Sequence, residues 1–191
     1  MCPDDNHPHI IDLGLPSGTK WACCNVGASK PDGYGGYYAW GETSKKNSYG
    51  VPEYKYCDDY GMEWSNIGTD IAGTSYDAAT VNWKAPWQMP TLAQCQELIY
   101  YTSSKWTILN GVCGKQFRGS NGNAIFLPAA GTHVGDNKPV LNEYGYYWSS
   151  TFVDDNDWGA YAHFLIFQSN SESTGSDFRS DGMSVRPVQK N

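Results

Sequence analysis

Four consecutive residues in the last quarter of the chain, Asp154, Asp155, Asn156 and Asp157, place carboxylate and amide oxygens side by side. Oxygen atoms of this kind are the ligands that Ca²⁺ prefers. The cluster lacks the glycine and the distant glutamate of an EF-hand loop, however. A solvated acidic turn is therefore the stronger interpretation, and calcium binding is the alternative.

Nucleophilic catalysis would need a cysteine beside a histidine. Cys95 or Cys113 could meet His133 or His163 in space, but Cys95 falls on the inward face of a predicted helix, where a thiol is usually inert. Glycosyl transfer would need two carboxylates at a defined separation. No spacing fixes such a pair among the scattered glutamates, which are Glu42, Glu97, Glu143 and Glu172. We therefore expect no catalytic activity.

Two histidines separated by one proline, His7 and His9, could bind Zn²⁺ or Ni²⁺ with help from Asp4 and Asp5. A chain terminus is a poor preorganised site, and the spacing is not that of a tetrahedral zinc centre. We therefore expect residues 1–9 to form a flexible tether without a metal, and we expect the protein to need no cofactor.

Six cysteines, at positions 2, 23, 24, 57, 95 and 113, could form up to three disulfides in an oxidising compartment. Cys23 and Cys24 are adjacent, so in a strand they point to opposite faces, and at least one of them is more simply a small buried side chain. If a precursor extended upstream, Cys2 could be the lipid-modified residue of a bacterial lipoprotein. The alternative is an unmodified terminus.

Composition limits the remaining classes of protein. The chain has 191 residues, which fit one domain, and its 8 Trp, 14 Tyr and 21 Gly indicate a β-rich protein with many loops. The net charge of −7, without a basic cluster, argues against nucleic-acid binding. There is no 18-residue apolar run and no export-signal pattern, so we expect membrane association only through a lipid at Cys2.

The first half of the chain predicts one hairpin and a long region of ordered loops. Residues 10–26 read as two strands, because Pro16-Ser17-Gly18 is a turn sequence between apolar runs. Residues 28–75 show little periodicity and many turn residues, so we expect long loops held by aromatic side chains. Those side chains are Tyr37, Tyr38, Trp40, Tyr54 and Tyr56.

The clearest predicted helix follows Pro90, where Thr91 can cap the first turn. Four apolar residues and a threonine then recur at steps of three and four, at Leu92, Cys95, Leu98, Ile99 and Thr102. A shorter helix is predicted over residues 75–83. Residues 112–130 return to a β pattern, with Gly119-Ser-Asn-Gly as the turn. These elements predict the α+β class.

Blocks spread over nearly the whole chain resemble a known family. They are Ile11-Asp-Leu-Gly-Leu-Pro-Ser-Gly-Thr-Lys-Trp-Ala, Asn25-Val-Gly-Ala, Tyr38-Ala-Trp-Gly-Glu-Thr, Tyr76-Asp-Ala-Ala, Met89-Pro-Thr, Asn121-Gly-Asn-Ala-Ile-Phe-Leu-Pro-Ala-Ala-Gly, Gly145-Tyr-Tyr-Trp-Ser-Ser and Ser184-Val-Arg-Pro-Val. This succession is similar to the Fibrobacter succinogenes major paralogous domain. The resemblance implies one C-type-lectin-like domain over residues 10–188, followed by a tail at 189–191. This fold is related to the formylglycine-generating enzyme and has antiparallel β-sheets, one or two short helices and long ordered loops.

The same resemblance implies a relation to the variable proteins of diversity-generating retroelements. In those proteins, adenine-directed mutagenesis alters exposed residues near the C-terminus. The corresponding ligand-binding candidates in this chain are Asp154, Asp155, Asn156, Asp157, Trp158, Tyr161, His163, Asn170, Glu172, Asp177, Phe178 and Ser180. They lie between Trp148-Ser-Ser and the expected final strand, Ser184-Val-Arg-Pro-Val.

Sugar binding and oxidase chemistry are the two alternatives that this resemblance raises. The tripeptides Glu-Pro-Asn, Gln-Pro-Asp and Trp-Asn-Asp of calcium-dependent lectins are absent, but a sugar could stack on Trp148, Trp158 or Tyr161. For Trp148, core packing is the stronger interpretation. A formylglycine-generating enzyme needs a cysteine pair in its C-terminal half, and the last cysteine here is Cys113.

The sequence therefore predicts a noncatalytic surface domain that binds a protein receptor or a glycan. Aromatic side chains and polar loops favour such recognition surfaces. We expect segments 152–159 and 168–181 to form the binding loops above Trp148. The resemblance places the protein at a bacterial cell surface or in the extracellular space, with a lipid anchor or a phage particle as further possibilities. A carbohydrate-binding module of a gut bacterium of the Bacteroidetes type is the alternative function.

Overall fold

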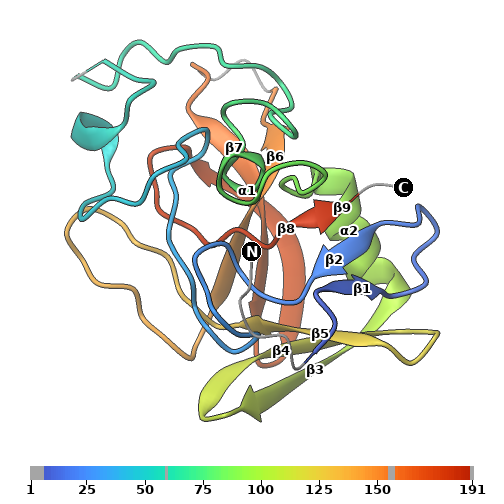
Figure 1. The fold of residues 1–191 in the computed structure, drawn as a ribbon. Helices are drawn as coiled ribbons and strands as arrows, with labels where there is room; N and C mark the ends of the chain where they lie inside the picture. Colours follow the sequence, from blue (N-terminus) through green and yellow to red (C-terminus); the bar gives the residue numbers. More distant parts are fainter. Residues whose placement is uncertain (1–6, 59, 155–157, 190–191) are drawn as a thin grey trace.

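Three small antiparallel sheets and two short α-helices form the regular structure, together with one 3₁₀ turn, in the part of the chain that the computed structural model describes (Figure 1). The described residues are 7–58, 60–154 and 158–189. Antiparallel sheets dominate and helices are few, which agrees with the α+β prediction at this coarser level. The helices have six and ten residues, so neither of these described helices is long enough to cross a bilayer.

The first sheet joins the two ends of the described chain. Strands β1 (Ile10–Asp12) and β2 (Lys20–Ala22) form the predicted hairpin, and β9 (Val188–Gln189) pairs with the other edge of β2. Gly18 closes the turn by donating its N–H to the Leu15 carbonyl at 2.9 Å, with a positive φ of 73°. The expected final strand at 184–188 is shorter than predicted, because Ser184 makes only an isolated bridge to Tyr147.

Helix α2 (Leu92–Tyr101) begins where the sequence predicts. The Thr91 hydroxyl accepts the Gln94 N–H at 3.2 Å, and the Gln94 side chain accepts the Thr91 N–H at 2.9 Å, which is a complete capping box. Helix α1 (Ala78–Trp83) begins three residues later than predicted. The Asp77 carboxylate takes the first free N–H groups of this helix, from Ala79 and Thr80, and so fixes its start.

The second sheet contains one strand that the sequence analysis did not predict. Strands β4 (Val112–Gly119) and β5 (Ala124–Pro128) match the predicted β region, and β4 also pairs along its whole length with β3 (Thr102–Leu109). Strand β3 follows α2 without an intervening loop. Its side chains alternate between half-buried and exposed positions, as expected for a strand with one face in solvent.

The third sheet corrects the prediction for segment 168–181. Strands β6 (Gly145–Phe152) and β7 (Tyr161–Gln168) are the two aromatic runs, and β8 (Ser171–Phe178) forms the edge beside β7. Most of the expected binding loop is therefore a regular strand. The polar composition of β8 suits a strand at the edge of a sheet. At Gly175, the Phe164 ring occupies the space of a side chain, because a Cβ on Gly175 would be 2.9 Å from that ring.

The β6-β7-β8 sheet lies between two buried clusters. One face carries Tyr147, Leu165 and Phe167 into a core shared with α2 and with the other two sheets. The opposite face carries Trp148 and Phe164 into a second core, formed largely with the loops that precede α1. Those loops contain only the 3₁₀ turn η1 (Val51–Glu53) among their described residues, as the sequence predicts for 28–75.

Candidate functional site

Three aromatic side chains form a continuous row at one end of the β6-β7-β8 sheet. Tyr161 begins β7, Phe178 ends β8, and the two are direct cross-strand partners with ring centroids 4.7 Å apart. The Trp64 ring also stacks on Phe178, with a centroid distance of 6.3 Å and an angle of 26° between the ring planes. We call these three residues the aromatic platform. Contacts of this geometry stabilise aromatic pairs beyond the area that they bury.

A buried arginine supports the platform from within. The Arg179 side chain is only 1% exposed, and its guanidinium lies 5.5 Å from the Trp64 ring centroid and 5.3 Å from that of Trp40. It donates hydrogen bonds to the Tyr54 hydroxyl and to the Ser65 carbonyl, both at 3.0 Å. No described carboxylate forms an ion pair with it. Aromatic faces and carbonyl oxygens therefore hold this cation and fix the loop that carries Trp64.

The connection between β6 and β7 adds a fourth aromatic side chain beside the platform. Trp158 is 70% exposed and has a positive φ of 55°. Its neighbour Gly159 packs against Trp64, since a Cβ at Gly159 would lie 3.6 Å from the Cβ of Trp64. Asp154 is exposed in the same connection. The other three acidic or amide candidates, Asp155, Asn156 and Asp157, lie outside the described residues.

His163 is the polar candidate that adjoins the platform. It lies two residues after Tyr161 on β7, so the two side chains are on the same face of the strand. Its cross-strand partner is Ser176, and the imidazole is half-buried. The structure therefore brings Tyr161, Phe178 and His163 together from the predicted set.

Two predicted site residues, Trp148 and Ser180, are buried and do not face solvent. Trp148 is fully buried in the second core, where its indole N–H donates to the Tyr38 carbonyl at 2.8 Å. This is the packing role that its aromatic neighbours indicated. Ser180 is 2% exposed because it follows Arg179 into the interior. Neither side chain offers a surface to a ligand.

The remaining candidates are separated from the platform by the sheet itself. Asn170 and Glu172 lie at the far end of β7 and β8, about 20 Å away for strands of this length. Glu172 is occupied by an ion pair with Lys115 and by a 2.8 Å hydrogen bond from Ser104. Asp177 lies on the opposite face of β8 from Phe178.

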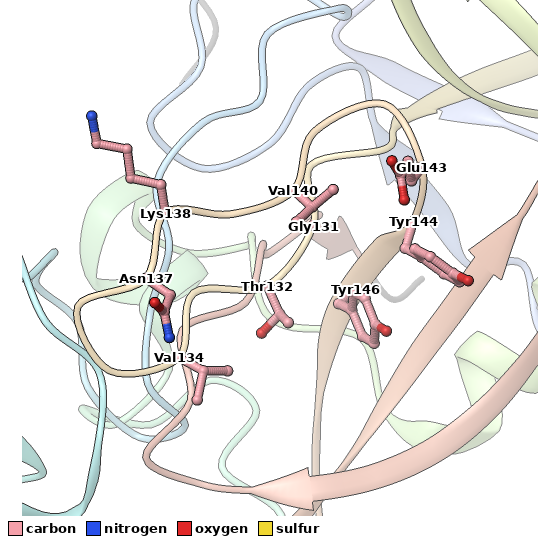
Figure 2. Close-up of a pocket in the computed structure, with 9 residues that line it drawn as sticks. All are labelled: Gly131, Thr132, Val134, Asn137, Lys138, Val140, Glu143, Tyr144 and Tyr146. Carbon is pink, nitrogen blue, oxygen red and sulfur yellow. The ribbon is translucent and has the colours of Figure 1, made fainter.

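A second candidate site is a cleft beside the start of β6, shown in Figure 2. Its volume is about 270 Å³, and the loop after β5 forms its opposite wall. The two rings of the β6 side, Tyr144 and Tyr146, have centroids 6.1 Å apart, and Tyr146 also packs on Phe164. We call this site the tyrosine cleft; it is lined by Gly131, Thr132, Val134, Asn137, Lys138, Val140, Glu143, Tyr144 and Tyr146.

The chemistry of the tyrosine cleft suits a small ligand with both apolar and hydroxyl groups. Val134 and Val140 are largely exposed, and Lys138 and Glu143 are the charged residues of the lining, although the Lys138 side chain extends away from the cleft (Figure 2). Burial, with smaller contributions from Tyr144 and Asp177, raises the pKa of Tyr146. Its phenol therefore stays protonated at neutral pH and can donate a hydrogen bond.

The cysteines give no support for the nucleophile pairs considered from the sequence. Cys95 is buried in the first core, and this burial raises the pKa of its thiol to about 12. His133 packs instead against the rings of Tyr37 and Tyr49. Among the described cysteines, Cys57, Cys95 and Cys113 are free thiols. A Cys–His contact is present elsewhere, between Cys23 and His9.

Trp64, Tyr144 and Tyr146 are not among the site residues that the sequence predicts. Trp64 is almost a hundred residues before Tyr161, in a loop region without periodicity. Tyr144 and Tyr146 belong to the aromatic run that ends at Phe152, from which the sequence predicts only Trp148 as a site residue. The high density of aromatic residues in both segments was the available signal, because large exposed rings mark many binding surfaces.

Comparison with known proteins gives one partial match. A family described as a domain of unknown function (DUF8237) matches residues 108–188, which contain Tyr161, Phe178 and the whole tyrosine cleft. Trp64 and the first hairpin lie outside this match. Comparisons with curated proteins and with solved structures found no match.

Proposed function

We propose that this chain is a noncatalytic ligand-binding domain that contacts its partner through the aromatic platform and Trp158. The observation that carries the proposal is the exposure of large rings at one end of a rigid sheet. Phe178 is 41% exposed, and Trp158 is 70% exposed. Contiguous exposed apolar groups on a soluble domain mark interaction sites more often than isolated ones do.

The surroundings of the platform suit recognition of a protein surface. Binding hot spots are rich in Trp and Tyr, and they are surrounded by polar groups that exclude water. Asp154 supplies such a group in the connection between β6 and β7, and His163 supplies another on the same strand face as Tyr161. Arg179 packs against the Trp64 ring on its buried side, and the Tyr54 hydroxyl holds Arg179 in place. A platform held in this way loses little conformational entropy when a partner binds.

Three features of the fold support a C-type-lectin-like scaffold as part of the proposal. They are the antiparallel sheets, the two short helices and the long ordered loops, all of which the resemblance to the Fibrobacter succinogenes major paralogous domain implies. That resemblance also suggests a bacterial cell surface as the setting, with a lipid anchor at Cys2. The fold itself is weak evidence for a particular ligand.

Carbohydrate binding is the second candidate function, and the tyrosine cleft is the observation that favours it. Tyr144 and Tyr146 present rings in a concave site whose lining also contains Thr132, Asn137 and Glu143. Sugars bind by stacking their apolar faces on such rings while their hydroxyl groups find polar partners. This cleft lies apart from the platform, so separate substitutions distinguish the two functions.

The test compares the binding of the fluorescently labelled domain to intact bacterial cells and to an array of plant and host glycans. Trp158→Ala and Phe178→Ala each remove one exposed ring, and Tyr144→Ala removes a ring of the cleft. Tyr100→Ala is the matched control, because Tyr100 is an exposed aromatic residue on α2. Loss of cell binding in the two platform variants alone supports the platform. Loss of glycan signal in Tyr144→Ala alone supports the second function, and unchanged binding in all variants contradicts both.

The proposed relation to diversity-generating retroelements has its own test in the source population. Deep sequencing of the 3′ end of the gene measures substitutions codon by codon. Diversification for binding predicts changes at adenines in codons of exposed residues, such as 158 and 178. It predicts none at 148 and 180, whose side chains are buried. An invariant 3′ end would remove the retroelement from the proposal.

A further inference from the structure

Two imidazoles and one thiol meet beside the first hairpin. The side chains of His7, His9 and Cys23 each offer one ligand atom, and these atoms all lie within 4.8 Å of one another. We propose that the three residues bind Zn²⁺. This site would be independent of the aromatic platform and the tyrosine cleft, because its residues lie just outside the ends of β1 and β2.

The hairpin register accounts for the placement of His9 and Cys23. Ile10 pairs with Ala22, and the next pair outward is His9 with Cys23, whose N–H donates to the His9 carbonyl at 3.1 Å. Directly opposed residues of an antiparallel pair have side chains on the same face. The backbone of the first sheet therefore brings the thiol and the imidazole together.

The other elements of this arrangement are also fixed by neighbouring structure. His7 is two residues before His9, and in an extended chain side chains two residues apart lie on the same side. The two rings meet edge to face, with centroids 5.4 Å apart. On the second strand, the Arg186 guanidinium donates to the Cys23 carbonyl at 3.1 Å, which fixes the backbone that carries the thiol.

The observed separation fits a tetrahedral zinc centre. Zn–N distances of about 2.0 Å and Zn–S distances of about 2.3 Å place a nitrogen and a sulfur ligand about 3.5 Å apart at a tetrahedral angle. The Nδ1 of His9 and the Sγ of Cys23 are 3.5 Å apart. His7 completes the site through a small rotation of its ring, since its ligand atom is already within 4.8 Å of the others.

The donor atoms select the class of metal ion. Thiolate and imidazole suit Zn²⁺ and similar borderline-soft ions, whereas Ca²⁺ and Mg²⁺ prefer oxygen ligands. The three donors among the described residues account for three of the four positions of a tetrahedral site. Metal binding would tie the segment that begins at His7 to the edge of the domain, and so would stabilise the folded state in proportion to the metal affinity.

The test uses Co²⁺ as a spectroscopic substitute for Zn²⁺ in the full chain, after reduction and removal of metals. We expect thiolate-to-cobalt charge transfer and the intense visible bands of tetrahedral Co²⁺, both displaced by one equivalent of Zn²⁺. Zn²⁺ should also raise the melting temperature. Cys23→Ser and His9→Gln should abolish the charge-transfer band. His7→Gln should weaken Co²⁺ binding by at least the roughly tenfold that even an outer-shell change causes.

Cys24→Ser is the matched control, because Cys24 is adjacent but its Sγ is directed at the Ala28 carbonyl instead. This variant and Phe178→Ala should keep the full cobalt spectrum. His9→Gln changes a partly exposed residue, so it remains informative if Cys23→Ser fails to fold. Absence of a charge-transfer band, or an equal band in Cys23→Ser, would overturn the proposal and leave Cys23 and His9 as a hydrogen-bonded pair.

Discussion

The Nε–H of Arg179 donates to the hydroxyl of Tyr54 across 3.0 Å, inside a shell of aromatic rings. This contact joins the end of β8 to a loop that precedes it by more than a hundred residues. A cation in such a position is stable only when its N–H groups have partners. The pair therefore explains how an irregular loop can hold Trp64 in a defined place under Phe178.

Replacement of Arg179 by Met should lower the free energy of unfolding by about 3 kcal/mol. The change leaves the buried Tyr54 hydroxyl without the donor of one hydrogen bond, at about 1–3 kcal/mol, and it also removes the hydrogen bonds to the partly buried carbonyls of Ser65 and Tyr56. Urea unfolding followed by fluorescence measures the loss. Arg118→Met, at an exposed position, should change stability by less than about 0.5 kcal/mol. Equal effects in the two variants would contradict a structural role for Arg179.

Asp181 should make stability depend on pH. Burial, and to a smaller extent the charge of Asp177, raises the pKa of Asp181 to about 7 in the folded state, from 3.8. The folded protein thus holds this proton more tightly than the unfolded chain does. Stability conferred by Asp181 should therefore fall as pH rises from about 4 to about 7, and then remain constant.

The Asp181→Asn variant isolates this effect, because an amide does not titrate. Between pH 4.5 and pH 8, the free energy of unfolding of this variant should rise relative to that of the parent protein by on the order of 2–4 kcal/mol. Urea midpoints at several pH values provide the measurement, with Asp136→Asn as an exposed control for the substitution itself. A constant difference between Asp181→Asn and the parent would show that the carboxyl is ionised in the folded protein.

The two partners of the Lys115–Glu172 ion pair should respond unequally to substitution. The Lys115 side chain is almost fully buried, whereas that of Glu172 is 24% exposed. Glu172→Leu leaves a buried ammonium without its carboxylate and should cost about 3 kcal/mol. Lys115→Met leaves a carboxylate that water can reach and should cost less. The double variant should recover stability relative to Glu172→Leu, and additive losses in thermal unfolding would disprove this coupling.

Substitution of the exposed Trp158 should affect stability much less than substitution of the buried Trp148. Trp158→Ala should leave the free energy of unfolding within about 1 kcal/mol of the parent value, because its ring is mostly in solvent. Trp148→Ala should lose about 3–5 kcal/mol through the cavity and the lost hydrogen bond to Tyr38. Thermal unfolding of the two variants checks the difference, and a large loss in Trp158→Ala would mean that its ring is part of the fold.

Local signals in the sequence were sufficient for the elements that they control directly. The capping residue Thr91 and the helical spacing of Cys95 and Leu98 predicted α2, and turn residues predicted the hairpins at Gly18 and Gly122. Strand β8 was missed because its residues are polar and small. It exists because β7 offers a full ladder of backbone partners and because Phe164 covers Gly175. Neither condition can be read from the segment itself.

The candidate site was predictable in part for the same reason. Tyr161, Phe178 and Trp158 lie in one aromatic and polar segment, so composition alone marked them. Trp64 belongs to the site only because tertiary packing over Arg179 places it beside Phe178. Trp148 does not belong to the site, because its side chain is on the face of β6 that packs into the second core. The residue types indicate a binding surface, but the strand register determines which aromatic side chains are exposed at that surface.

The pairing of β2 with β9 has a consequence for synthesis of the protein. Trp21, near the beginning of the chain, pairs with Ile11 on one side, but its partner on the other side is Val188, near the end. Translation delivers these residues many seconds apart, at roughly 5–20 residues per second. Until β9 leaves the ribosome, one edge of β2 lacks its strand partner, and much of the first core is exposed to solvent. The nascent domain should therefore depend on chaperones or on fast elongation to avoid aggregation before its first sheet can close.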